Sequence, residues 1–144
     1  MQGIVTHPKV LRASEQNRRA TYSNAAHIED LIHKVQPAVY YFSGSVKTYG
    51  EKPKNLFTDI PSLNGISNAD ILKNNIELVV IKIKNAAELN SVIDLSVLSG
   101  YKNLKYIYVI SGVSTAQENI TRMIRNYEDK YSVFYKIDKG DNNQ

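Results

Sequence analysis

The side chains that most often carry out chemistry are few in this chain and form no known motif. The histidines are His7, His27 and His33, and the last two stand six positions apart, which does not place them on one face of a helix. Glu29 and His33 are four positions apart, a spacing that favours a surface ion pair over a metal ligand or an acid–base pair. We therefore expect no histidine metal site.

Other catalytic signatures are also missing from the sequence. Asp59, Asp70 and Asp94 each stand alone, so no paired-carboxylate motif is present. There is no Gly-x-Ser-x-Gly turn and no glycine-rich phosphate loop of either common type. The chain has no cysteine, which excludes disulfides, thiolate metal ligands and a cysteine nucleophile. These absences favour a protein that is not an enzyme and has no cofactor or bound metal.

Small polar residues gather where the predicted strands end. The carboxyl ends of parallel strands are the usual ligand site of α/β sheets, and the free N–H groups that begin a helix predicted at 116–130 could hold an anion. The candidate residues of this anion site are Ser43, Ser45, Asn85, Ser111, Gly112, Ser114 and Thr115. The same residue types also cap helices and form turns, so a purely structural role is the alternative.

The elements that would position these residues follow from the pattern of apolar side chains. Short β-branched and aromatic runs predict strands at 38–42, 78–83, 104–110 and 131–137. Apolar residues at helical spacing predict helices at 24–36, 86–98 and 116–130. Helical crossovers favour parallel pairing of the strands that they join. The expected fold class is α/β, with three to four mainly parallel strands and helical crossovers.

Length and composition predict one domain of ordinary globular character. We expect a flexible lead-in at 1–21, a single α/β domain at 22–137 with a long connection at 46–75, and a disordered tail at 138–144. No apolar run is long enough to span a bilayer, and the first residues lack the apolar region of a secretion signal. The compartment stays open between the cytoplasm and, if an export signal has been removed, the periplasm or cell envelope.

The two faces of the predicted strands differ in composition. One face is apolar and must be covered, whereas the other mixes tyrosine and lysine, side chains that often contact partners. The residues predicted on this binding face are Lys82, Lys84, Tyr106 and Tyr108, extended by Tyr40 and Tyr135. The alternative is that these tyrosines lie under the long connection with their hydroxyl groups hydrogen-bonded.

Charge bears on the class of partner. The net charge of +4 is spread along the chain, whereas a nucleic-acid-binding protein usually carries a denser basic stripe. Nucleic-acid contact through Arg18, Arg19, Lys47, Lys52 and Lys54 is therefore the least favoured hypothesis. The leading hypothesis is a non-catalytic binding or structural module whose partner is a macromolecule, with protein preferred. The rival is a small domain or enzyme that binds an anion or phosphate ligand at the strand ends.

A weak internal repeat adds a family resemblance. An offset of 26 positions aligns apolar residues, pairing Leu72 with Leu98, Leu78 with Leu104, Ile81 with Ile107 and Ile83 with Val109. The spacing over residues 72–110 resembles the leucine-rich repeat, although Gly112 stands where that repeat has an asparagine after the strand. The resemblance implies a short curved solenoid that binds rather than catalyses. An ordinary open α/β sheet is the alternative.

Overall fold

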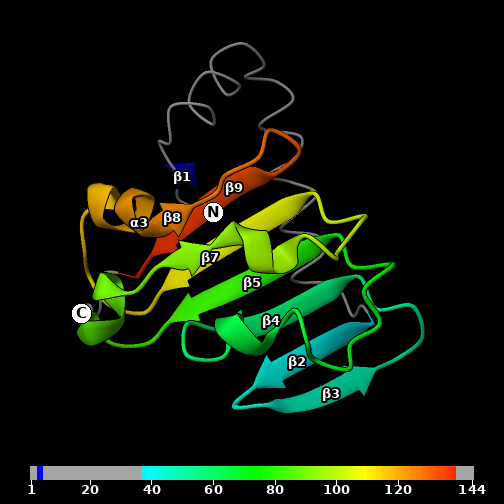
Figure 1. The fold of residues 1–144 in the computed structure, drawn as a ribbon. Coiled ribbons are helices and arrows are strands. Elements are labelled where there is room, and N and C mark those ends of the chain that lie inside the picture. Colours follow the sequence, from blue (N-terminus) through cyan, green and yellow to red (C-terminus); the bar gives the residue numbers. More distant parts are fainter. Residues whose placement is uncertain (1–2, 5–36, 139–144) are drawn as a thin grey trace.

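The computed structural model describes residues 3–4 and 37–138, which form a large sheet and the turns that cover it (Figure 1). The strands of the main sheet lie in the order β1-β9-β7-β5-β4-β2-β3. The central five are β2 (Ala38–Phe42), β4 (Asn55–Asp59), β5 (Leu78–Ile83), β7 (Tyr106–Ser111) and β9 (Ser132–Ile137). These five strands run parallel, and they lie side by side in the order in which they occur in the chain.

The two edge strands run in the opposite direction. β3 (Ser45–Tyr49) pairs antiparallel with β2, and β1 (Gly3–Ile4) pairs antiparallel with β9. The sheet is therefore mixed but mostly parallel, which confirms the α/β class in its coarse form. Four of the central strands, β2, β5, β7 and β9, lie where the sequence predicts strands.

The crossover predicted as a helix at 86–98 is instead two 3-10 turns separated by a short strand. These are η2 (Ala86–Asn90), β6 (Ile93–Asp94) and η3 (Leu95–Leu98). Asn85 Oδ1 accepts a hydrogen bond from the Glu88 N–H, and Asp94 Oδ1 accepts one from the Ser96 N–H. The Asn85 bond caps the start of η2, whereas Asp94, inside the predicted helix, has an extended backbone and caps a new turn, so the helical spacing of the apolar residues does not produce one continuous helix.

The helix predicted at 116–130 is shorter in the structure. α3 (Gln117–Met123) has seven residues and is followed directly by β8 (Ile124–Arg125), which pairs in parallel with β6. Asn126 then adopts a positive φ of 61°, which turns the chain towards β9. Pairing with β6 thus replaces the last turns of the expected helix.

The segment expected as a long connection, 46–75, contains most of β3, all of β4 and the 3-10 turn η1 (Leu63–Gly65). β2 and β3 are joined by Ser43 and Gly44, whose φ angles of 53° and 79° are typical of a tight hairpin turn. The predicted helix at 24–36, the tail beyond residue 138 and the lead-in, apart from the two residues of β1, lie outside the described residues.

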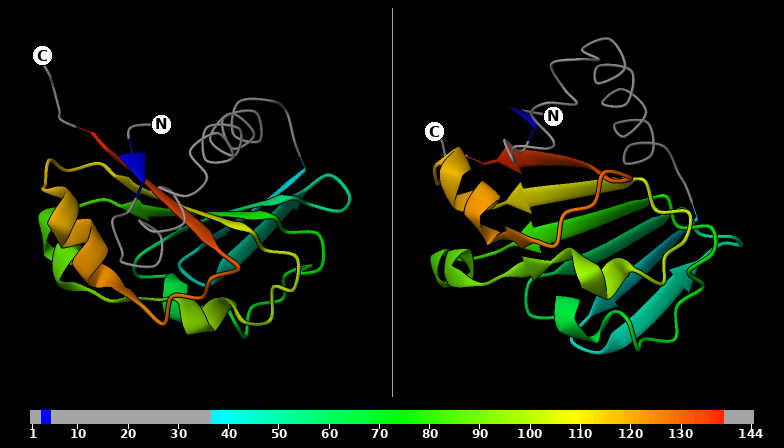
Figure 2. Two further views of the ribbon diagram at one scale, coloured as in Figure 1. Left: turned by 90° about the horizontal axis from the view of Figure 1, so that it is seen from above. Right: turned by 45° about the horizontal axis from the view of Figure 1, so that its top comes forward.

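The core lies on one side of the sheet, which we call the core face. It is formed by alternate strand residues that are fully buried, among them Val39, Leu56, Ile81, Ile107 and Val133. The turns η1 and η3 and the helix α3 contribute Leu63, Leu95, Leu98, Ile120 and Met123 to the same cluster. Figure 2 shows these turns and α3 together on this side of the sheet. Among the described helices, none has the length and apolar character needed to cross a membrane.

Candidate functional site

The opposite side of the sheet, which we call the second face, carries a row of mostly aromatic residues. The register places one residue from each of five neighbouring strands in this row, and the residues are Tyr40, Phe57, Val80, Tyr108 and Phe134. Side chains alternate between the faces of a strand, so these five point away from the core face. The row includes two tyrosines of the binding face predicted from the sequence.

The middle of the second face is buried. Leu78, Val80, Tyr108 and Phe134, the central patch, are each at most 2% exposed and form a hydrophobic cluster of their own. Tyr106, Phe57 and Ile110 pack against this cluster and are partly buried. The central patch therefore has almost no exposed surface for a partner to contact. Tyr108 therefore does not offer the open contact surface that the sequence predicted for it.

Exposed aromatic side chains occur where the second face reaches β2 and β3. Tyr40 is 39% exposed and Tyr49 is 56% exposed. The Tyr40 ring stacks on Phe57 with the ring centres 4.9 Å apart, and it meets the edge of Tyr49 at 5.6 Å. We call Tyr40, Tyr49 and Phe57 the aromatic platform. Each ring is held by a neighbour, so the platform is a preformed apolar surface rather than three independent side chains.

A pocket of about 610 Å³ opens beside the platform. Its described lining residues are alternate positions of β2 and β3, namely Ala38, Tyr40, Phe42, Ser45, Lys47 and Tyr49. Alternate residues of a strand share one face, which explains why a simple hairpin builds the whole lining. Among these described lining residues, Lys47 is the charged one, and it lies directly opposite Tyr40 in the strand register.

Lysines extend the second face towards the carboxyl ends of the strands. Lys82, Lys84 and Lys136 are exposed there, in agreement with the sequence-based placement of the first two. Lys82 and Lys136 form no ion pair with any residue of the described segments. Lys84 differs because it pairs with Asp59. The basic charge that is free for a partner on this part of the face thus belongs to Lys82 and Lys136.

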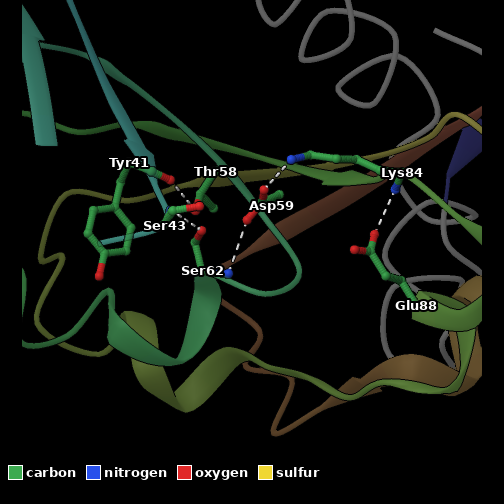
Figure 3. Close-up of polar contacts among 7 residues, drawn as sticks. All are labelled: Tyr41, Ser43, Thr58, Asp59, Ser62, Lys84 and Glu88. Carbon is green, nitrogen blue, oxygen red and sulfur yellow. Dashed lines mark hydrogen bonds and ion pairs between the residues drawn. The ribbon is translucent and has the colours of Figure 1, made fainter. Parts of the chain in front are cut away.

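The pair of Lys84 and Asp59 is the most buried charged interaction in the described structure (Figure 3). Lys84 Nζ lies 2.5 Å from Asp59 Oδ2, and the Ser62 N–H donates to Asp59 Oδ1 at 3.0 Å. Burial raises the pKa of Asp59, but the hydrogen bonds from Lys84 and Ser62 outweigh burial and leave that pKa below its ordinary value. The bond to Asp59 in turn raises the pKa of Lys84. Both groups are therefore charged at neutral pH.

Further hydrogen bonds around this pair connect the ends of β2, β4 and β5 to neighbouring turns and strands. Ser62 Oγ accepts from the Ser43 N–H at 2.9 Å, which ties η1 to the hairpin turn. Thr58 donates to the Tyr41 carbonyl at 2.8 Å, and Glu88 accepts from the Lys84 N–H at 2.7 Å (Figure 3). Each of these contacts joins two groups of the protein, so the cluster holds the ends of neighbouring strands together.

The predicted anion site is dispersed, and most of its groups bond within the chain. Buried Ser111 donates through Oγ to the Val113 carbonyl, and the Gly112 N–H donates to the Ile83 carbonyl. Thr115 Oγ1 accepts a hydrogen bond from Asn119. The Ser43 N–H donates to Ser62 and Asn85 Oδ1 accepts from Glu88, as described above, whereas Ser114 is exposed. Ser45 lies in the pocket beside the platform. These residues do not form one cluster, and their role in binding stays a prediction.

Tyr106 and Tyr135 are separated by the sheet. Tyr106 lies on the second face beside the central patch and is half-buried. Tyr135 packs against the core face, where its hydroxyl group donates to Gln117 Oε1 of α3 at 3.1 Å. The structure therefore brings Tyr40, Lys82, Lys84, Tyr106 and Tyr108 to one face and leaves Tyr135 on the other.

Three aromatic residues of this site, Tyr49, Phe57 and Phe42, are not among those predicted from the sequence. A signal was present, because Ser43-Gly44 between two alternating runs is typical of a two-residue hairpin. Reading residues 45–49 as a strand would have put Tyr49 and Lys47 on the face of Tyr40. The sequence-based prediction instead places residues 45–49 at the end of strand 38–42 and in a long connection, where no face is defined.

Comparison with known proteins leaves the site to be interpreted from its own geometry. No protein-family model matches the chain, and no similar curated protein or solved structure was found. Within residues 37–138, no group of three His, Asp or Glu side chains is arranged to hold a metal ion. His7, His27 and His33 lie outside the described residues.

Proposed function

We propose that the protein is a non-catalytic binding module that recognises a protein partner through the aromatic platform and Lys47. The observation that carries the proposal is the exposure of Tyr40 and Tyr49, two large aromatic side chains that lie in contact on the second face. Tyrosine presents a wide apolar area with little conformational freedom to lose, and it is enriched where proteins bind one another.

The arrangement of charge supports a protein as the partner. Lys47 stands next to the platform, and Lys82 and Lys136 lie further along the same face without ion partners in the described segments. A surface with an apolar aromatic centre and a charged margin has the composition of a protein interface. The three lysines are spread over β3, β5 and β9, so they do not form the dense basic stripe expected for nucleic acid.

The scaffold that we propose for this function is a short solenoid, in line with the leucine-rich-repeat resemblance. Its support is that the parallel strands follow chain order across the sheet, from β2 through β4, β5 and β7 to β9. The offset between β5 and β7 is 28 positions, since Leu78 pairs with Tyr106, rather than the 26 of the sequence alignment. Stacked units of this kind offer one extended face to a partner.

The proposal is tested by selecting short random peptides on the immobilised protein and measuring the affinity of the enriched peptides by calorimetry. We expect replacement of both Tyr40 and Tyr49 by serine to weaken these peptides at least about tenfold, which corresponds to 1.4 kcal/mol. The matched control replaces Leu72 and Val92 by serine, because these two are also large, apolar and exposed, at 62% and 51%.

Circular dichroism first establishes that both variants are folded. Equal loss of affinity in the platform variant and the control variant would indicate non-specific apolar adhesion and would overturn the proposal. Failure to enrich any peptide, or unchanged affinity in the platform variant, would overturn it as well.

A further inference from the structure

We infer that the outer edge of β3 binds an extended acidic segment of the partner by adding it to the sheet as a further strand. This inference rests on the proposed function, because it specifies how the partner meets the platform. β3 is the last strand of the sheet, and no described strand lies beyond it. Four of its five residues are exposed, and Val46 is half-buried.

The hairpin register determines which backbone groups face outwards. Ser43 and Gly44 form a two-residue turn, so the flanking residues Phe42 and Ser45 make the first hydrogen-bonded pair. Bonded and non-bonded pairs alternate along an antiparallel ladder, so Tyr40 with Lys47 and Ala38 with Tyr49 are the next bonded pairs. The N–H and C=O groups of the residues between them point away from β2. These residues are Val46 and Thr48, which offer two donors and two acceptors to an added strand.

The side chains of β3 define what the added strand should carry. Ser45, Lys47 and Tyr49 point to the second face, so the added residue beside Lys47 meets a positive charge and the one beside Tyr49 meets an aromatic ring. On the core face, Val46 packs against the hydrophobic core, and an apolar residue beside it would extend that core. The fitting segment therefore has an acidic and an aromatic or aliphatic residue on one side and an apolar residue on the other.

Lys47 also argues against a second copy of the chain as the occupant. Pairing of two β3 edges through Val46 and Thr48 would be antiparallel and centred on Lys47, which would place two lysines side by side on the same face. Like charges that lie directly opposite destabilise strand pairs, and lysine on an edge strand commonly prevents self-association. An acidic segment converts the same side chain from a repulsive contact to an attractive one.

The first experiment asks whether the bound segment pairs through its backbone. An enriched peptide is synthesised in two forms, with N-methyl groups on either the odd or the even residues, and each is titrated by calorimetry against the full chain. A strand exposes alternate amides to its neighbour, so we expect one form to lose at least about tenfold in affinity and the other to bind like the parent peptide. Equal affinity of both forms and the parent would overturn strand addition.

The second experiment asks whether Lys47 selects acidic segments. Lys47→Glu should weaken an acidic enriched peptide and strengthen its analogue with lysine in place of the acidic residues, whereas the control Lys102→Glu, in the exposed turn between η3 and β7, should leave the preference for the acidic form in place. Both lysines are exposed, and the fold of each variant is checked first by circular dichroism. An unchanged preference in Lys47→Glu would overturn the role of Lys47, as would an equal change in both variants.

The two proposals fail in different ways. Loss of binding in the platform variant together with indifference to N-methylation would keep the platform as the contact surface but exclude an added strand. If N-methylation weakens binding but replacement of Tyr40 and Tyr49 does not, strand addition at β3 would be supported and binding through the aromatic platform would be overturned.

Discussion

Tyr108 and Tyr49 point to the same face of the sheet, but the first is 2% exposed and the second is 56% exposed. Tyr108 lies on β7 near the middle of the sheet, with Val80 and Phe134 as its neighbours in register. Tyr49 lies on β3 at the edge (Figure 1). The difference shows that the position of a strand in the sheet, and not residue type, decides whether an aromatic side chain stabilises the fold or is available to a partner.

The same contrast applies to charge on this face. Lys84 is bound by buried Asp59, so its charge serves the fold, whereas Lys47 lines an open pocket. The central patch and the Asp59–Lys84 pair should therefore govern stability, and the aromatic platform with Lys47 should govern binding. Substitutions in each group of residues test that division.

Phe134→Ala should be the most damaging of these changes. Phe134 is 2% exposed in the central patch, and truncating a buried phenylalanine costs about 3–5 kcal/mol through lost apolar contact and the cavity left behind. The free energy of unfolding is measured with urea. A cost below 1 kcal/mol, at the level of a surface substitution, would mean that the central patch is not part of the stabilising core.

Asp59→Asn should have an intermediate effect that depends on pH. The change removes the charge that accepts hydrogen bonds from Lys84 and Ser62, at a cost of about 1–2 kcal/mol at pH 7. The lowered pKa of Asp59 means that its contribution is complete above the unfolded-state pKa of about 4 and is lost as the pH falls through the lower folded-state value. The stability difference between wild type and variant should therefore shrink as the pH falls below about 4. A difference that is constant over this range would contradict the assignment.

The contact between Tyr40 and Phe57 should contribute less. Stacked aromatic pairs are worth about 0.5–1.5 kcal/mol beyond the area that they bury. A double-mutant cycle with Tyr40→Ala and Phe57→Ala, read from urea unfolding, gives this coupling energy. A coupling of zero would indicate that the platform rings do not support each other and that the surface is not preformed.

Tyr49→Ala should have the smallest effect on stability. Tyr49 is more than half exposed on an edge strand, so we expect a change within about 0.5 kcal/mol. The result is read from the same urea series as Phe134→Ala. A cost of several kcal/mol would place Tyr49 among the residues that hold the fold and would remove the contrast between the two parts of the face.

The strands were largely predictable from the sequence, because their β-branched and aromatic runs are long and continuous. The run at 78–83 is β5 without change, and its apolar content reflects burial on both faces of a central strand. The crossovers were not predictable in the same way. Apolar residues at 86–98 have helical spacing, but Asp94 is extended and its side chain caps a second 3-10 turn, which divides the segment.

The candidate site was predictable only in part. Alternation placed Lys82, Lys84, Tyr106 and Tyr108 on one face correctly, because Lys82 and the two tyrosines lie within two recognisable strands and Lys84 directly follows the first of them. Strand alternation cannot reveal that Tyr108 is covered and Tyr40 is not, since that depends on tertiary packing. Tyr49 is not among the predicted residues because the sequence predicts a connection where β3 lies. Asp59 looked isolated because its partner Lys84 lies 25 positions away in the sequence.

The most direct test of the account compares two tyrosines of the same face in two assays. Tyr49→Ala and Tyr108→Ala are each examined for urea stability and for calorimetric affinity towards an enriched peptide. We expect Tyr49→Ala to keep its stability and lose at least about tenfold in affinity, and Tyr108→Ala to lose about 3 kcal/mol of stability or more. If Tyr49→Ala instead binds the peptide like the wild type, or if Tyr108→Ala is as stable as the wild type, the proposed division of the face is contradicted.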